Sequence, residues 1–177
     1  MDKKKIEHLI QEVNSGTTEA FTKALSEIKK TSKSDFIDPL LDRLSKEDAE
    51  SEVFQLIHAT MVEIKISEAL PKFIARLETQ KEAHIHQAIL YFIWNSGLDA
   101  SDQLGIITKV GLEGDYMTSF EALTVLENQD GPFQEESVLD ALLACKTYLS
   151  KNEVDDQRKG IIEAIVKQLH AIEGKVQ

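Results

Sequence analysis

Cysteine occurs only once in this chain of 177 residues, at Cys145. A single thiol excludes an intramolecular disulfide and a metal site built from several cysteines. Cys145 lies among leucines at helical spacing, so we expect it to pack in the core rather than to react. Proline (3) and glycine (8) are also scarce, which disfavours a fold with many tight turns and a nucleotide site with glycine-rich loops. Long uninterrupted helices fit this composition.

Long hydrophobic runs are missing as well. The longest, Ala88–Trp94, covers about two helical turns, far short of the roughly 20 residues that span a bilayer. Residues Met1–Glu12 contain no continuous apolar segment of the kind that a secretory signal needs. We therefore expect no membrane association and a cytoplasmic location.

Positive charge is in short supply, because 20 Lys and Arg stand against 31 Asp and Glu and leave a net charge of −11. A protein that binds duplex DNA draws most of its non-specific affinity from Lys and Arg that displace counterions. Nucleic acid is therefore a disfavoured partner. The one tight basic run, Lys3–Lys5, lies at the start of the first helix, where we expect it to aid solubility. The acidic balance weakly favours a basic partner.

The motifs of catalytic and metal-binding sites are absent, including the phosphate-binding loop, the zinc-protease helix, the nucleophile elbow and the calcium loop. His84 and His86 lie two residues apart on a predicted helix, so their rings point about 200° apart and cannot share one ion. Paired carboxylates such as Glu135-Glu136 lie at helix starts, where they favour the helix dipole. We expect no catalytic residue, no cofactor and no metal ion, although a site assembled from distant residues would leave no local trace.

Apolar residues recur at helical spacing along almost the whole chain. This periodicity predicts ten helices with short connections, so that successive helices are antiparallel neighbours. Their predicted bounds are Asp2–Val13, Thr18–Lys30, Asp35–Ser45, Glu50–Ile66, Ser67–Gln80, Glu82–Ser96, Ser101–Leu112, Asp115–Asn128, Gln134–Ser150 and Val154–Ile172.

The breaks between these helices have recognisable chemistry. Ser34, Ser51 and Asp115 are candidate N-caps, and Gly97 can supply the left-handed residue that ends a helix. Gly131-Pro132 forbids continuation of a helix. No linker or low-complexity segment divides the chain, which predicts a single helical-repeat domain over residues 1–177.

The strongest pattern is a step of 33 residues, which links equivalent apolar positions in successive helix pairs. The first helices share the row Leu44, Leu77, Val110 and Leu143. The second helices share three rows: Ile57, Leu90 and Leu123; Leu56, Ile89 and Ala122; and Thr60, Ile93 and Leu126. A helix pair cannot cover its own apolar stripe, and stacking neighbours at a constant step buries one continuous core. The sequence therefore predicts an all-α fold, a right-handed α-solenoid of about five antiparallel helix pairs.

Two segments carry a family resemblance. Ala69–Leu77 has a proline early in a helix, and Ile85–Trp94 alternates small and apolar residues. They resemble the two helices of a HEAT repeat, and the resemblance to the HEAT and armadillo-like superfamily covers roughly Asp35–Leu149. It implies a scaffold that binds other proteins along the concave surface lined by the second helices. A few members are enzymes, including alkylpurine DNA glycosylases and bilin lyases, and such an activity is the alternative function.

The 33-residue step also identifies side chains of the second helices that point away from the core. These are Gln55, His58 and Val62, then Ala88, Tyr91 and Asn95, then Glu121, Thr124 and Asn128, with Trp94 beside them. Partly exposed Tyr and Trp next to polar groups are typical of interface hot spots, although Tyr91 and Trp94 could equally be large core residues with one wet edge. We predict that this ribbon binds a protein or peptide, that acidic residues steer its approach, and that the chain is a monomer.

Overall fold

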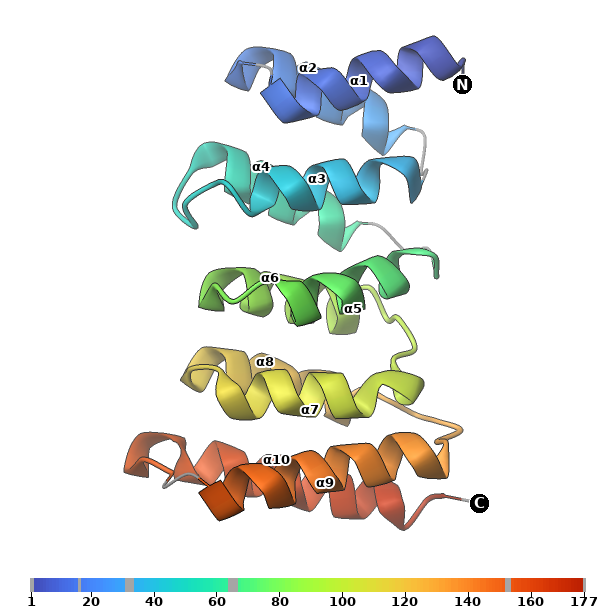
Figure 1. Cartoon of the computed structure of the whole chain (residues 1–177). Coiled ribbons are helices and arrows are strands. Elements are labelled where there is room, and N and C mark those ends of the chain that lie inside the picture. The colour runs from blue at the N-terminus through green and yellow to red at the C-terminus, as the bar shows by residue number, and fades with distance from the viewer. Residues whose placement is uncertain (1, 16, 31–33, 64–66, 152–153, 177) are drawn as a thin grey trace. The chain divides into compact units, whose positions relative to one another are not determined.

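The computed structural model describes residues 2–15, 17–30, 34–63, 67–151 and 154–176. Within these ranges it contains ten α-helices and two short 3-10 helices, and no strand (Figure 1). The chain divides into two compact units, unit 1 (Met1–Lys72) and unit 2 (Phe73–Gln177). The predicted all-α class is confirmed.

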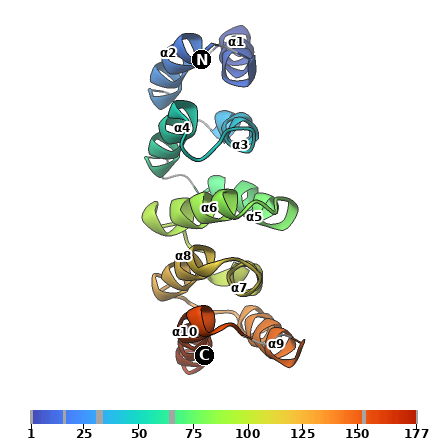
Figure 2. The ribbon, with the colours of Figure 1, turned by 90° about the vertical axis from the view of Figure 1, so that its left-hand side faces the viewer.

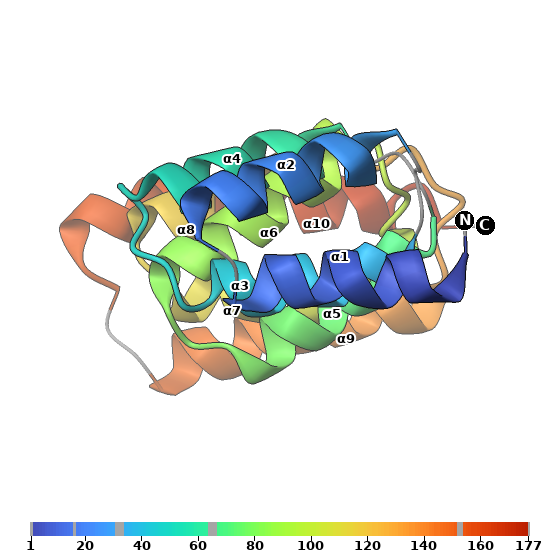
Figure 3. The same ribbon diagram turned by 90° about the horizontal axis from the view of Figure 1, so that it is seen from above.

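Unit 1 contains α1 (Lys3–Ser15), α2 (Thr18–Lys29), α3 (Ile37–Leu44) and α4 (Glu52–Val62), with the first residues of α5 (Ala69–Thr79). Helix α1 packs against α2 and α3, and α4 packs against the same two helices. Figure 3 shows α1 and α2 running side by side in opposite directions. The four helices thus form two pairs around a core of their apolar faces.

Unit 2 contains the rest of α5 and the helices α6 (Ala83–Asn95), α7 (Leu104–Glu113), α8 (Tyr116–Glu127), α9 (Glu135–Lys151) and α10 (Asp156–Glu173). The rings of Phe73 on α5 and Phe92 on α6 lie 5.8 Å apart between centroids. Helix α8 packs against α6, α7 and α10, and α9 packs against α7 and α10. Figure 2 shows α8 and α10 on one side of this unit and α7 and α9 on the other.

Most helix ends lie within two residues of the predicted ones. The helices predicted to begin at Asp35 and Ser101 instead open with 3-10 turns, at Ser34–Phe36 and Ser101–Gln103. In the second case side chains satisfy the early backbone donors, since Asp99 Oδ1 accepts from the Ser101 N–H at 3.0 Å. The predicted end of the fourth helix at Ile66 lies outside the described residues, and α4 ends at Val62.

The helix caps follow the sequence signals. Ser51 Oγ accepts from the Phe54 N–H at 3.0 Å, and Asp115 Oδ1 accepts from the Thr118 N–H at 2.8 Å. Gly97, just beyond α6, has a φ of 65° and occupies the left-handed region, as predicted. Ser34 is different, because it begins a 3-10 turn rather than capping an α-helix.

Burial follows the 33-residue step in the second helices. The row of Ile57, Leu90 and Leu123 is at most 8% exposed. The other two rows are buried except for Leu56, which is half-buried. In the first helices Leu44, Leu77 and Val110 are also buried. The periodicity therefore identified core positions in both units.

Leu143, the fourth member of the first-helix row, does not follow the pattern: its side chain is 60% exposed. The buried residues of α9 are instead Ser137, Val138, Ala141 and Cys145. Ser137 Oγ donates to the Ser101 carbonyl at 2.9 Å, and a Cβ at Gly105 would lie 3.1 Å from Asp140 Cβ. This close approach sets the rotation of α9 and turns Leu143 outward, so its predicted core position is wrong.

The C-terminal end of α7 is the point where three helices of unit 2 meet. A Cβ at Gly111 would lie 2.6 Å from Ala122 Cβ of α8, so only glycine fits there. Arg158 of α10 donates from Nη2 to the carbonyl oxygens of Leu112 at 2.7 Å and Gly111 at 3.3 Å. A cation at a helix C-terminus satisfies carbonyls that lack an intrahelical partner.

Gly111→Ala is expected to lower the free energy of unfolding by about 1–3 kcal/mol, because the added methyl must push α7 away from α8. The matched control is Gly160→Ala, on an exposed position of α10 where an added Cβ meets nothing within 4 Å. That substitution should raise the same free energy by about 0.5–1 kcal/mol. Urea denaturation of both variants measures the difference, and equal stabilities would show that the two helices can separate at no cost.

Candidate partner-binding surface

The three ribbon residues on α4 form a group within unit 1. Gln55 is exposed and its amide donates to the Ala49 carbonyl at 2.7 Å. His58 and Val62 are half-buried. The His58 ring stacks on that of Phe54 one turn earlier, with 6.3 Å between centroids, and burial lowers its pKa. These contacts lie along a single helix, so His58 packs here as a neutral aromatic ring.

The other predicted residues come together on two neighbouring helices of unit 2. Tyr91, Trp94 and Asn95 on α6 are half-buried, as are Glu121 and Thr124 on α8, and Asn128 at the C-cap of α8 is exposed. The packing of α6 against α8 brings these two sets side by side. Ala88 does not belong to the surface, because it is only 4% exposed. It faces the core, where a methyl group allows α6 to approach its neighbours.

The centre of the surface is a contact between Trp94 and Glu121. The indole Nε1–H donates to Glu121 Oε2 at 2.7 Å, which joins α6 to α8 through a charge-assisted hydrogen bond. Tyr91 lies one turn before Trp94, and the two rings meet edge to face, with centroids 4.9 Å apart and planes at 76°. Each of the three side chains therefore constrains its neighbour, which gives a fixed corner of two ring systems and one carboxylate.

The Glu121 carboxylate is held at some energetic cost. Burial raises its pKa, and the hydrogen bond from Trp94 opposes that rise without cancelling it. Neither α6 nor α8 contains a lysine or an arginine that could neutralise the charge. Groups whose pKa is shifted by burial in this way are more common at functional sites than elsewhere.

A second carboxylate lies at the N-terminal end of the same two helices. Gln87 of α6 donates from Nε2 to both oxygens of Asp115, at 3.1 and 3.0 Å. Burial raises the pKa of Asp115, but hydrogen bonds from the Thr118 N–H and hydroxyl and from Gln87, together with the positive charge of Arg158 on α10, outweigh it and leave this pKa lowered. Asp115 is therefore negatively charged at neutral pH and adds to the acidic character of the surface.

Three large apolar side chains on α8 are exposed beside these polar groups. Tyr116 and Met117 are each 48% exposed and Phe120 is 45% exposed. Tyr116 and Phe120 are four residues apart and share one face of α8, and Met117 has the same relation to Glu121. None of the three was among the residues predicted from the sequence, because the 33-residue step picks out only positions that have equivalents in the other helix pairs. The available signal was that α8 has apolar residues on every side, more than its packed face can bury.

We use the name α6–α8 surface for the six predicted residues together with this apolar cluster. Its members are Tyr91, Trp94, Asn95, Tyr116, Met117, Phe120, Glu121, Thr124 and Asn128. Helix α9 in the same unit also exposes Leu139, Leu143 and Leu149, but it contains two lysines. The α6–α8 surface differs in its aromatic side chains and in having no basic residue on either helix.

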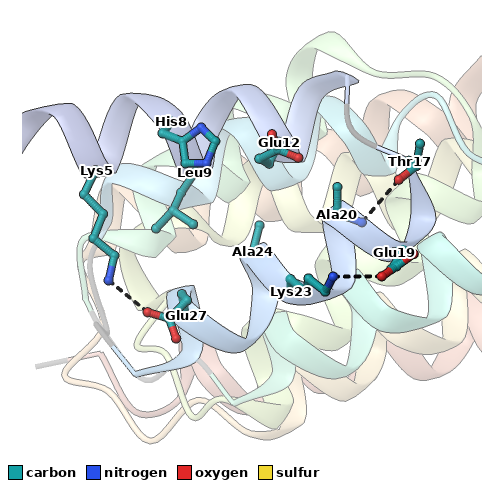
Figure 4. A pocket seen from close by; sticks show the side chains of 10 residues that line it. All are labelled: Lys5, His8, Leu9, Glu12, Thr17, Glu19, Ala20, Lys23, Ala24 and Glu27. Atoms are coloured by element: carbon teal, nitrogen blue, oxygen red, sulfur yellow. Dashed lines mark hydrogen bonds and ion pairs between the residues drawn. The ribbon is translucent and has the colours of Figure 1, made fainter.

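Unit 1 has a groove of its own between α1 and α2 (Figure 4), with a volume of about 510 Å³. Leu9, Ala20 and Ala24 supply its apolar lining. The charges on its walls are largely paired with each other: Lys5 Nζ lies 2.9 Å from Glu27 Oε2, and Lys23 Nζ lies 2.8 Å from Glu19 Oε1. Hydrogen bonds from Lys30 and Lys5 lower the pKa of Glu27 to about 2. With its charges satisfied internally, the groove offers little to select a ligand.

The structure also shows the surroundings of Cys145 and His86. Cys145 is 4% exposed, as expected for a packed thiol, and burial raises its pKa to about 11. A ring nitrogen of His86 lies 2.9 Å from the Gln80 carbonyl. Among the described residues no three His, Cys, Asp or Glu side chains are grouped so that they could hold a metal ion. None of the described helices has the length and apolar character that crossing a bilayer requires.

Comparison with protein-family models, curated proteins and solved structures finds no match to this chain.

Glu121→Gln is expected to raise the free energy of unfolding at pH 7, because the amide still accepts from Trp94 but carries no charge. A folded-state pKa above that of the unfolded chain means that the carboxylate costs stability once it ionises. The cost is absent below the unfolded pKa of about 4.3 and appears as the pH rises through the folded value. Urea titrations from pH 4 to 7 should therefore show the advantage of the variant growing with pH.

The control is Glu127→Gln, which removes a carboxylate from an exposed position of the same helix. A Glu121→Gln variant that is less stable than the parent protein at pH 7 would contradict the argument, since the stronger hydrogen bond to the charged carboxylate would then outweigh its desolvation.

Proposed function

We propose that this chain is a protein-interaction module that binds a protein or peptide on the α6–α8 surface. The observation that carries the proposal is the exposed cluster of Tyr116, Met117 and Phe120 beside the Trp94–Glu121 pair. Aromatic residues and methionine are enriched at protein interfaces, and hot spots combine such anchors with polar groups at their edge. Large apolar side chains grouped on a surface favour a partner that covers them.

The charge of the surface supports a basic partner. Helices α4, α6 and α8 contain no lysine or arginine, although the chain has 20 of these residues. Glu121, together with Asp115 at the N-cap of α8, gives this surface acidic side chains, and the net charge of −11 has the same sign. Such a field accelerates association with a positively charged segment and disfavours acidic competitors.

The same feature weighs against the alternative of a HEAT-like DNA glycosylase. An enzyme of that type would need a basic groove to bind duplex DNA, because phosphate contacts supply most of the affinity. The α6–α8 surface has aromatic residues but no cation on either helix. A protein partner is therefore favoured over nucleic acid at this surface.

We further propose that the helix pairs belong to a HEAT-like, right-handed α-solenoid. The support is that equivalent positions at a 33-residue step are buried in unit 1 and in unit 2, as Leu44 and Leu77 illustrate. Pro39 and Pro71 are also each the third residue of their helices, α3 and α5, where a missing N–H costs no intrahelical bond.

The α6–α8 surface can be tested with a library of displayed random peptides selected on the purified protein. Phe120→Glu is expected to weaken the selected peptides at least tenfold, because it places a charge in the apolar cluster. Phe120 is 45% exposed, so the substitution leaves the core intact. Fluorescence polarisation with labelled peptides measures the change.

Leu143→Glu is the matched control, since it puts the same side chain on an exposed apolar position of α9 in the same unit. The proposal predicts that it leaves binding unchanged. Peptides that lose affinity with Leu143→Glu and not with Phe120→Glu would move the binding surface to α9 and contradict the assignment.

A further inference from the structure

The corner formed by Tyr91, Trp94 and Glu121 has the composition of a cation site. Its two ring systems meet edge to face at 76°, and both side chains are half-buried, so part of each remains accessible. Glu121 Oε2 is held by the Trp94 indole, and among the described residues Glu121 Oε1 accepts no hydrogen bond. A cation near aromatic faces and a carboxylate gains from both, and most when the carboxylate is partly desolvated.

Unit 1 already contains an arginine between an aromatic ring and a glutamate. The Arg43 guanidinium lies 5.7 Å from the centroid of the Phe21 ring. Its Nε donates to Glu47 Oε1 at 2.6 Å, and both charged side chains are less than one-fifth exposed. Arg43 is therefore the cation that contacts both the Phe21 ring and the Glu47 carboxylate. On α6 and α8 the Glu121 carboxylate lies beside the Trp94 indole, and neither of these helices supplies a lysine or an arginine.

We propose that the Tyr91–Trp94–Glu121 corner is a subsite for one arginine side chain of a bound peptide. The inference rests on the proposed function, because it names the chemistry of the partner at the α6–α8 surface. Arginine fits better than lysine for a physical reason: a guanidinium is planar and weakly hydrated, stacks on aromatic rings and still donates to a carboxylate. An ammonium must give up a more strongly held hydration shell to enter a half-buried corner.

The apolar cluster of Tyr116, Met117 and Phe120 indicates which residues of the ligand lie next to its arginine. Met117 lies one turn before Glu121 on α8, and Tyr116 and Phe120 share the adjoining face. A peptide whose arginine occupies the corner therefore has apolar side chains near it, which can cover the three exposed residues. The partner we infer is a basic segment with apolar residues flanking an arginine.

Trp94 provides a direct measurement, because it is the only tryptophan in the chain and its indole N–H gives a single, identifiable NMR signal. We would titrate the full chain with the amides of N-acetyl-arginine, N-acetyl-lysine and N-acetyl-citrulline at constant ionic strength. Citrulline has nearly the shape of arginine but no charge. The arginine compound should shift the signal saturably, the lysine compound should bind several-fold more weakly, and the citrulline compound should leave the signal in place.

Glu121→Gln keeps the hydrogen bond to Trp94 and removes the charge, so the affinity for the arginine compound should fall about tenfold. Glu127→Gln, on the same helix, should bind like the parent protein. Equal responses to arginine and citrulline, or unchanged affinity in Glu121→Gln, would overturn the subsite.

Failure of the subsite and failure of the proposed function give different results. Selected peptides that depend on Phe120 but tolerate replacement of every arginine by citrulline would overturn the arginine subsite and leave the α6–α8 surface in place. If no selected peptide depends on Phe120, the proposed function is wrong even where the arginine compound still shifts the Trp94 signal. Peptides that lose at least tenfold in affinity when Phe120 is replaced by Glu, and also when their arginines are replaced by citrulline, support the proposed function and the arginine subsite.

Discussion

The packing of α8 against three other helices is the constraint on which unit 2 depends. Helices α6, α7 and α10 cover most of its circumference, and at its closest approach the contact admits only glycine and alanine, at Gly111 and Ala122. Ser119 completes the contact by donating to the Gly111 carbonyl at 2.7 Å. One face of α8 is left uncovered, and the side chains on it are not required for packing. Because the rigid arrangement of α8 also positions α6, the exposed face becomes a preorganised surface.

Two glutamates in similar surroundings illustrate the difference between a structural ion pair and a candidate recognition group. Glu47 is only 18% exposed and is paired with Arg43, so its charge is compensated within the fold. Glu121 is half-buried beside an indole, and neither α8 nor α6 contains a basic residue. A partly desolvated charge destabilises the protein until an external cation reaches it. Binding energy can then come from relieving that cost as well as from new contacts.

The positions of the helices could be predicted from local patterns alone. Apolar spacing, the caps at Ser51 and Asp115 and the break at Gly97 depend on residues within one turn of each other, and the structure places each where it was expected. The rotation of α9 could not be predicted in the same way. It depends on hydrogen bonds from Ser137 and on the space at Gly105, which involve residues more than 30 positions apart, and the periodicity alone placed Leu143 on the wrong side.

The candidate surface could likewise be predicted only in part from the sequence. The repeat step was sufficient to select Tyr91, Trp94, Glu121 and their neighbours as outward-facing, because equivalent positions in amphipathic helices have equivalent directions. It could not show that Ala88 is buried, that Trp94 bonds to Glu121, or that Tyr116, Met117 and Phe120 are exposed. Sequence thus determined which residues form helices and which face of most helices is apolar. Tertiary packing decided which apolar residues remain uncovered, because burial depends on how closely neighbouring helices approach and not on the helix itself.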